Sequence, residues 1–224
     1  AMTFGMGTAY AKSIGMTSSQ ASLFLVAVTI GTMVLQYPVG RLSDILDRRL
    51  VIFLVAIISA IAAAAAAFFS AEQFWPLIIL MALYGGFSMT IYSLCIAHAN
   101  DYLTPSQMVG TASTLIMVNG IGAVVGSPLI AVFMEFVSNR AYFAGLVIVH
   151  IATGVYALAR MKARAPVPAE AQGPFIAVPE AGTAIAATLN PEAAWDDITE
   201  DDDLATAMLS ANPYLDLPAQ TDNT

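Results

Sequence analysis

The sequence predicts an all-α membrane protein, and three observations point to that fold class. Hydrophobic residues make up 58% of the 224 residues and charged residues only 11%, where a soluble domain carries about 25% charged residues. Five apolar stretches are long enough to cross a bilayer, which takes about 20 helical residues. Apolar residues run continuously along them, without the two-residue alternation of a membrane β-barrel. We therefore expect a bundle of helices with the bilayer as its solvent.

The chain opens inside apolar sequence. The eleven residues Ala1–Ala11 would rise about 16 Å as a helix, roughly half of the hydrocarbon core. We expect the end of a helix, residues about 1–14, whose beginning lies upstream. Five further helices are predicted at residues about 20–40, 50–69, 75–100, 108–137 and 141–160. Short connections make consecutive helices antiparallel, so residues 1–164 form one transmembrane domain of six helices, the first of them truncated.

Charge separates this domain from the rest of the chain. The part up to Arg164 holds 8 basic and 5 acidic residues, a net charge of +3, whereas the remaining 11 acidic residues give the tail −11. Residues 165–224 are rich in Pro, Ala and acidic groups, and such a segment buries too little apolar area to offset its ordering entropy. We expect a disordered acidic tail. An alternative is a short helix around Trp195 that docks on a partner.

The basic residues set the orientation. With alternating helices, six of them lie on one side of the membrane and two, Lys12 and Arg140, on the other. Basic residues favour the cytoplasmic side, so that side and the C-terminus are predicted to be cytoplasmic. Because the basic residues occur singly or in threes between apolar runs, no nucleic-acid partner is expected. The six are Arg41, Arg48, Arg49, Arg160, Lys162 and Arg164.

The residues between the second and third predicted helices, Gly40–Arg49, form the sharpest motif, and we call them the signature loop. They resemble the cytoplasmic loop signature of the major facilitator superfamily (MFS), Gly-x-Leu-Ser/Ala-Asp-Arg-x-Gly-Arg-Arg/Lys. Ile45 stands where an arginine is usual and Asp47 where a glycine is usual. Gln36-Tyr37-Pro38, just before, is similar to the eighth helix of that family. The matching residues are Gly40, Leu42, Ser43, Asp44, Arg48 and Arg49.

This resemblance implies the C-terminal six-helix half of a twelve-helix transporter, close to poorly characterised bacterial MFS permeases. Two such halves rock about a central cavity, so the resemblance implies secondary-active or facilitative transport of an unidentified small solute by alternating access. The expected partners are the lipid bilayer and an N-terminal six-helix half that this chain lacks. The chain alone is expected not to transport unless it pairs with an N-terminal half or with another copy of itself. The alternative is a non-transporting membrane scaffold whose acidic tail binds a cytoplasmic partner.

The resemblance also implies an inner gate. Asp44, Arg48 and Arg49 would act as a latch at the cytoplasmic end, together with Gly40 and Leu42. The missing arginine at Ile45 is expected to weaken the charge network of that latch. The alternative is that these residues are ordinary positive-inside anchors beside a helix cap. Three polar residues at the cytoplasmic end of the fourth predicted helix, residues about 75–100, are assigned to the same gate or its cap: His98, Asn100 and Asp101.

Polar residues in the fourth predicted helix, residues about 75–100, are the candidates for the substrate cavity. Gly85-Gly86 is expected to break this helix, and interrupted helices near the midplane often bind substrate in transporters. Tyr84, Ser88 and Tyr92 lie four residues apart and share one helix face. With Asn119 of the fifth predicted span, they are predicted to line the cavity. The alternative is that these polar groups hydrogen-bond helix to helix.

Glycines of the fifth predicted span are assigned to helix packing and bending. Gly120, Gly122 and Gly126 precede Pro128, and closely spaced glycines let membrane helices approach one another. The functional interpretation is a pliable gate, and the simpler one is tight packing alone; Gly85 and Gly86 belong to the same class. The spacing does not fit a dinucleotide-binding fingerprint.

No enzyme chemistry is predicted. The two histidines, His98 and His150, lie on separate stretches, and no HExxH, GxSxG or P-loop motif is present. We expect a neutral, hydrogen-bonded His150 and no cofactor or metal site.

Overall fold

The computed structural model describes residues 2–103, 105–163, 175 and 177, and within them it contains helices and no strands. This confirms the predicted all-α fold class. A short 3₁₀ turn, η1 (Ala71–Gln73), precedes the fourth α-helix. The α-helices are α1 (Met2–Ser13), α2 (Ser18–Ile45), α3 (Arg48–Ala66), α4 (Phe74–Ser88), α5 (Thr90–Asn100), α6 (Pro105–Phe136) and α7 (Ala141–Ala163).

Five helical segments of the described chain are long and apolar enough to cross a membrane. They are α2, α3, the run from η1 through α5, α6 from Ser113 onward, and α7. The chain is therefore an integral, multi-pass membrane protein.

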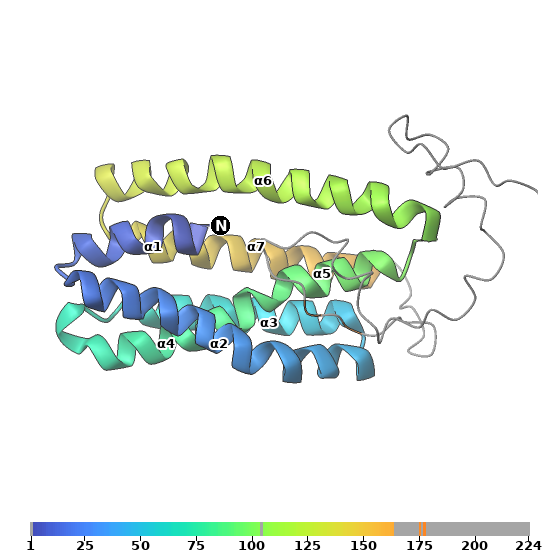
Figure 1. The fold of residues 1–224 in the computed structure, drawn as a ribbon, viewed down its shortest axis with the longest axis horizontal. Helices are drawn as coiled ribbons and strands as arrows, with labels where there is room; N and C mark the ends of the chain where they lie inside the picture. Colours follow the sequence, from blue (N-terminus) through green and yellow to red (C-terminus); the bar gives the residue numbers. More distant parts are fainter. Residues whose placement is uncertain (1, 104, 164–174, 176, 178–224) are drawn as a thin grey trace, which may run out of the picture. The chain divides into compact units, whose positions relative to one another are not determined.

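The helices pack side by side, as Figure 1 shows. Helix α2 packs against α4 and α1, and α3 packs against α7 and α4. Helix α6 contacts α1 and α7. It is the least covered of the membrane-spanning helices, because only 6% of its most apolar 18-residue segment is buried, compared with 56% of the corresponding segment of α3. The core therefore lies mainly among α1–α5 and α7, and α6 contributes Ile130 to it.

Local sequence explains where two of the helices begin. Thr17 and Gln20 form a capping box at the start of α2, in which each side chain binds the other residue's backbone N–H. Gly15, with φ of 87°, makes the turn between α1 and α2, a conformation that residues with a Cβ rarely adopt. Asp47 caps α3 by accepting the backbone N–H of Arg49 at 3.0 Å.

The signature loop is mostly helical. Helix α2 continues past the predicted end at residue 40 to Ile45, and only Leu46 and Asp47 separate it from α3. Gly40, Leu42 and Asp44 therefore lie on the last turns of a helix, with Gly40 and Asp44 one turn apart on the same side.

Glycines let α2 and α4 approach at backbone distance. A Cβ added at Gly31 would collide with the main chain of Ala82, and one added at Gly86 would lie 2.7 Å from the carbonyl oxygen of Gly31. Gly85 meets the main chain of Val28 in the same way. These glycines hold two helices together.

The interruption in the fourth predicted span lies at Met89, between α4 and α5. We expected it at Gly85-Gly86, but α4 runs through both glycines to Ser88. Packing on α2 keeps the glycine pair helical. At the joint, the Thr90 hydroxyl donates to the Gly86 carbonyl at 2.7 Å, a side-chain bond that competes with the backbone ladder and bends helices.

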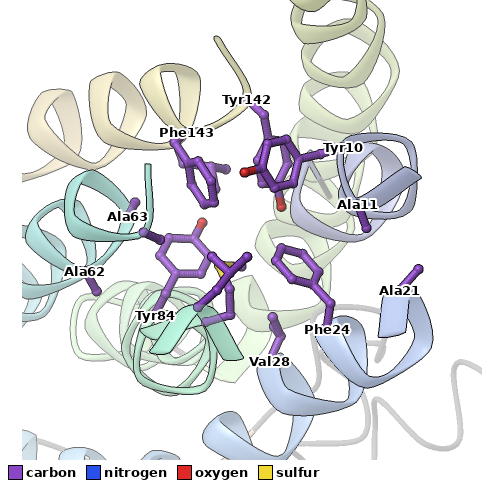
Figure 2. Close-up of a cluster of buried hydrophobic side chains, with 14 of the residues drawn as sticks. Tyr10, Ala11, Ala21, Phe24, Val28, Ala62, Ala63, Tyr84, Tyr142 and Phe143 are labelled. Atoms are coloured by element: carbon purple, nitrogen blue, oxygen red, sulfur yellow. The ribbon is translucent and has the colours of Figure 1, made fainter. Parts of the chain in front are cut away.

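Aromatic side chains fill the core at the end of the bundle opposite the signature loop. The ring of Tyr10 stacks on Tyr142, with centroids 4.9 Å apart, and meets Phe143 edge-on at 4.8 Å. Phe24 lies beside them, as Figure 2 shows, with Tyr84 pointing into the same cluster. These contacts join α1, α2, α4 and α7.

The predicted acidic tail, residues 165–224, lies outside the described residues except for Phe175 and Ala177. Both proposals for the tail, disorder and a short helix around Trp195, stay predictions.

Candidate functional site

A buried arginine lies at the centre of the predicted gate. Arg48, at the start of α3, has a side chain only 2% exposed. Its Nη1 donates to Asp101 Oδ1 at 2.7 Å and to the Ala97 carbonyl at 2.9 Å, and its Nη2 donates to Asp44 Oδ1 at 3.1 Å. One guanidinium thus joins the end of α2, the start of α3 and the end of α5. We call Asp44, Arg48 and Asp101 the Arg48 cluster.

The Arg48 cluster places two charged side chains, Arg48 and Asp101, away from solvent, so their charges must be compensated within the protein. The Asp101 side chain is 2% exposed, like that of Arg48, whereas Asp44 is 37% exposed. Desolvating a charge costs several kcal/mol unless it is paired with good geometry. Arginine suits this position because its planar fork presents several donors at once.

Arg49, the second arginine at the start of α3, pairs locally. Its Nε and Nη2 donate to the two carboxylate oxygens of Asp47 at 3.0 and 2.8 Å. The hydrogen bond from Arg49 holds the pKa of Asp47 below its ordinary value. Asp47, which replaces the usual glycine of the signature, therefore caps α3 and pairs with Arg49.

The other departure from the signature removes no member of the Arg48 cluster. Ile45 is 74% exposed and lies outside the cluster, so its side chain points away from the buried arginine. That the missing arginine weakens the charge network of the gate stays a prediction. Leu42 is also exposed, at 42%.

Of the three polar residues assigned to the gate from the fourth span, Asp101 joins the Arg48 cluster. His98 packs its ring edge-on against Tyr102, with centroids 5.3 Å apart. Asn100 ends α5, and its carbonyl accepts the backbone N–H of Leu103 at 3.1 Å. His98 and Asn100 thus form the helix end beside the cluster.

Tyr84 and Ser88 make contacts between helices. Tyr84 is 1% exposed and its hydroxyl lies 3.2 Å from Thr3 Oγ1 on α1. Ser88 Oγ lies 2.8 Å from His150 Nε2 on α7, and His150 Nδ1 lies 2.7 Å from the Leu146 carbonyl. Because a carbonyl only accepts, Nδ1 carries the proton, and Nε2 accepts from Ser88. This geometry is the helix-to-helix alternative of the sequence analysis.

Tyr92 lies on α5, beyond the joint at Met89, and its neighbours differ from those of Tyr84 and Ser88. It packs with Ile96 of α5 and Leu115 of α6. Beside it, Gln36 of α2 donates to Ser93 Oγ at 3.0 Å, and Asn119 lies half-buried on α6.

Polar groups of α2 and α5 thus meet through Gln36 and Ser93, and Tyr92 contacts α6 beside them. Ser93 was missed as a site residue because it is off the Tyr84 face. The signal that finds it is Gln36, whose amide needs a partner within an apolar helix.

The glycines of α6 are open. A Cβ added at Gly120 or Gly122 meets nothing within 4 Å, so these glycines do not pack against a helix of the described chain. Gly126 is half-buried and Pro128 exposed, and α6 continues through both to Phe136. Tight packing at these glycines stays a prediction that concerns a surface beyond the described residues.

No metal-ligand geometry appears in the part of the chain that the structure describes, where no three His, Cys, Asp or Glu side chains come together around one point.

Comparison with known proteins gives the family. The model of the Major Facilitator Superfamily matches residues 1–213. Similar curated proteins are each named "Uncharacterized MFS-type transporter YcaD": one from Escherichia fergusonii is 23% identical over 143 residues, and those from Salmonella paratyphi B and Salmonella newport are 24% identical over the same length. The match covers 62% of this chain and 35% of each relative, so the aligned part spans about a third of the relatives' length. No solved structure matches.

The family match and these similarities agree with the signature loop and with the membrane-spanning helices. The chain belongs to the major facilitator superfamily, a family of membrane transporters and not of enzymes.

Proposed function

We propose that this chain is the C-terminal six-helix part of a transporter that carries a small solute by alternating access, with the Arg48 cluster as part of its inner gate. The proposal extends to the orientation: the signature loop and C-terminus face the cytoplasm, in a bacterial inner membrane. The partner is an N-terminal six-helix half, and the 35% coverage of the relatives supports a longer functional protein.

The observation that carries the gate is the burial of Arg48 among acceptors from two other helices. With Asp101 and the Ala97 carbonyl on α5 and Asp44 on α2, the arginine makes the inner ends of three helices move as one body. Alternating access requires such bodies, because halves that rock must not deform internally.

Asp44 has a second role in this proposal. It is the exposed member of the Arg48 cluster, at 37%, so one carboxylate faces outward while it is held by the buried arginine. That position fits a contact with the other half at the cytoplasmic seam. Breaking the cluster inside this chain therefore changes the gate between the halves.

The cavity face in this proposal is formed by Gln36, Tyr92, Ser93 and Asn119. These polar groups come from α2, α5 and α6, and polar residues within membrane spans mark solute pathways more often than lipid contacts. The substrate class is not fixed by them, because amide, hydroxyl and phenol groups bind many polar solutes.

Cysteine accessibility tests the gate. A cysteine at Tyr92, in a Cys95→Ser background, is labelled with a membrane-impermeant maleimide from the cytoplasmic side of native-membrane vesicles. Arg48→Gln is expected to change the labelling rate by about threefold or more, because the three helix ends separate. Arg41→Gln is the matched control, since Arg41 lies on the Tyr37 ring at 4.8 Å and outside the cluster. Equal rates in all three proteins would contradict the gate.

A second experiment tests the need for another half. The purified chain alone is reconstituted as a monomer in vesicles and assayed with a panel of small solutes. No uptake is expected, because half of the cavity wall is lacking. Uptake by the monomer would overturn the two-half proposal and leave the Arg48 cluster as a local structural feature.

A further inference from the structure

Phe175, which follows the last helix by about a dozen residues, contacts the signature loop directly. Its backbone N–H donates to Asp44 Oδ1 at 3.0 Å, the same oxygen that accepts from Arg48 Nη2 at 3.1 Å. Its ring lies over Gly40, so closely that any Cβ at that position would collide with the ring carbons. A residue from beyond the membrane domain is therefore bound by two of the residues that match the family signature.

The two contacts come from one helix face. Gly40 and Asp44 lie four residues apart, and residues at that spacing are neighbours on a helix surface. The glycine leaves a notch that accepts an aromatic ring, and the carboxylate one turn later accepts the N–H of the same residue. The end of α2 thus contacts both the side chain and a backbone group of Phe175.

The ring of Phe175 also reaches the apolar core of the inner end. It is half-buried and packs against a cluster that includes Val39 of α2, Val51 of α3 and Leu94 of α5. These are the three helices whose ends Arg48 joins. Phe175 therefore adds an apolar contact to the same helices that the charge cluster holds by hydrogen bonds.

We propose that the inner end of α2 is a binding site for this chain's own Phe175, and that the bound residue holds the inner gate in one state. This inference rests on the gate role proposed above. Tethering supports it, because a span of about a dozen residues can reach roughly 40 Å and gives its end a high effective concentration at the site. A bound segment shifts a two-state gate only if it binds one state more tightly. Phe175 packs against α2, α3 and α5 together, so a movement that separates these helix ends would break its contacts.

Photocrosslinking tests the binding site. The whole chain carries p-benzoylphenylalanine at Phe175, which keeps the ring and the backbone N–H, and is irradiated in native membranes. We expect an adduct within the same chain, mapped by mass spectrometry to residues 39–51. The control places the probe at Ala177, which is exposed, and we expect its yield to be lower by about fivefold or more.

A glycine variant checks that the notch is the cause. Gly40→Ala adds the colliding Cβ with little risk to the helix, and it is expected to remove most of the adduct. Gly122→Ala, where an added Cβ meets nothing within 4 Å, is the matched change and should leave the yield as it was. Equal yields at 175 and 177, no loss with Gly40→Ala, or an adduct to another polypeptide would each overturn the binding site.

Regulation has its own readout. With the cysteine at Tyr92 as reporter, Phe175→Ala is expected to raise the cytoplasmic labelling rate by about threefold. An unchanged rate would overturn the regulatory claim, even if the adduct forms. If Arg48→Gln also left the rate unchanged, the proposed gate itself would be wrong, so the two failures are distinguishable.

Discussion

At the scale of single residues, the two carboxylates around Arg48 are not equivalent, because one is buried and the other is partly in water. We predict that Asp101→Ala lowers the free energy of unfolding by about 3–5 kcal/mol, since it removes the buried carboxylate partner of a buried guanidinium and leaves only the partly exposed Asp44 to pair with it. Asp44→Ala is expected to cost about 1 kcal/mol or less, because an exposed carboxylate contributes little. Thermal unfolding in detergent measures both, and equal losses would contradict the burial argument.

Asp47 gives a prediction about pH. The hydrogen bond from Arg49 lowers the pKa of Asp47 in the folded protein, so this carboxylate stabilises the fold at pH values above the ordinary aspartate pKa of about 3.9. Its contribution is lost as the pH falls through the lower pKa of the folded state. Asp47→Asn should therefore lower the melting temperature at pH 7. At pH 3 the difference in melting temperature between the variant and the unchanged protein should be smaller. A constant difference across that range would count against the pairing.

Single residues also show how far the sequence reaches. The signature loop predicted Asp44 and Arg48 as gate residues, and the polar end of the fourth predicted helix added Asp101 to the gate or its cap. The structure brings these three side chains together. Sequence alone could not pair Arg48 with Asp101, because the contact crosses 53 positions and depends on how α3 packs against α5. Nor could it show that Arg49 pairs with Asp47, two residues away, through both carboxylate oxygens.

At the scale of helices, α2 and α4 approach each other at backbone distance. We predict that Gly31→Ala destabilises the protein by at least about 1–3 kcal/mol, because the added Cβ collides with the main chain of Ala82, which has no flexible end to give way. Gly122→Ala is the control, with open space around the new methyl group. Melting temperatures in detergent should fall only for the Gly31 variant, and a fall of equal size in both would indicate a general intolerance of these helices to substitution.

The joint between α4 and α5 is held by a histidine on a third helix. Ser88 donates to His150 Nε2 at 2.8 Å, and the Leu146 carbonyl fixes the tautomer that accepts it. Ser88→Ala is expected to cost about 1–3 kcal/mol, since it leaves a buried acceptor without its donor. Unfolding in detergent measures this loss. Ser22→Ala is the control, because the Ser22 hydroxyl only bonds back within its own exposed helix; a loss as large there would contradict the assignment.

The sequence predicted which segments form membrane-spanning helices, but not where the fourth of them is interrupted. Continuous apolar runs predict spanning helices because the bilayer demands both length and internal hydrogen bonding. The joint at Met89 was misplaced onto Gly85-Gly86 because a glycine pair reads as a breaker in sequence, whereas contact with α2 makes it a packing surface. Tertiary contacts, which no local pattern encodes, decide between those two roles.

At the scale of the whole molecule, α6 is the membrane-spanning helix that the rest of the described chain covers least. Large apolar side chains along it are exposed, among them Met117 at 60%, Val124 at 74% and Phe136 at 79%. Some of that surface faces lipid, where apolar side chains are at no cost. The open glycines Gly120 and Gly122 are different, because a smooth backbone surface is useful only where another helix approaches. That difference supports the proposal that another half packs here.

The proposed function depends on which side of the membrane the signature loop faces. Ile45, 74% exposed, lies at the end of α2, and Asn139 lies in the turn between α6 and α7. They are on opposite sides if α3, the span through α5, and α6, which separate them, each cross once. In a Cys95→Ser background, we predict that Ile45→Cys in sealed, right-side-out cells reacts with an impermeant maleimide only after the cells are opened. Asn139→Cys should react from outside in intact cells. The physical basis is the excess of arginine around the loop, which favours the cytoplasmic side. The reverse pattern would place the Arg48 cluster at the outer face, and the inner-gate proposal would then be wrong even though the cluster itself remained.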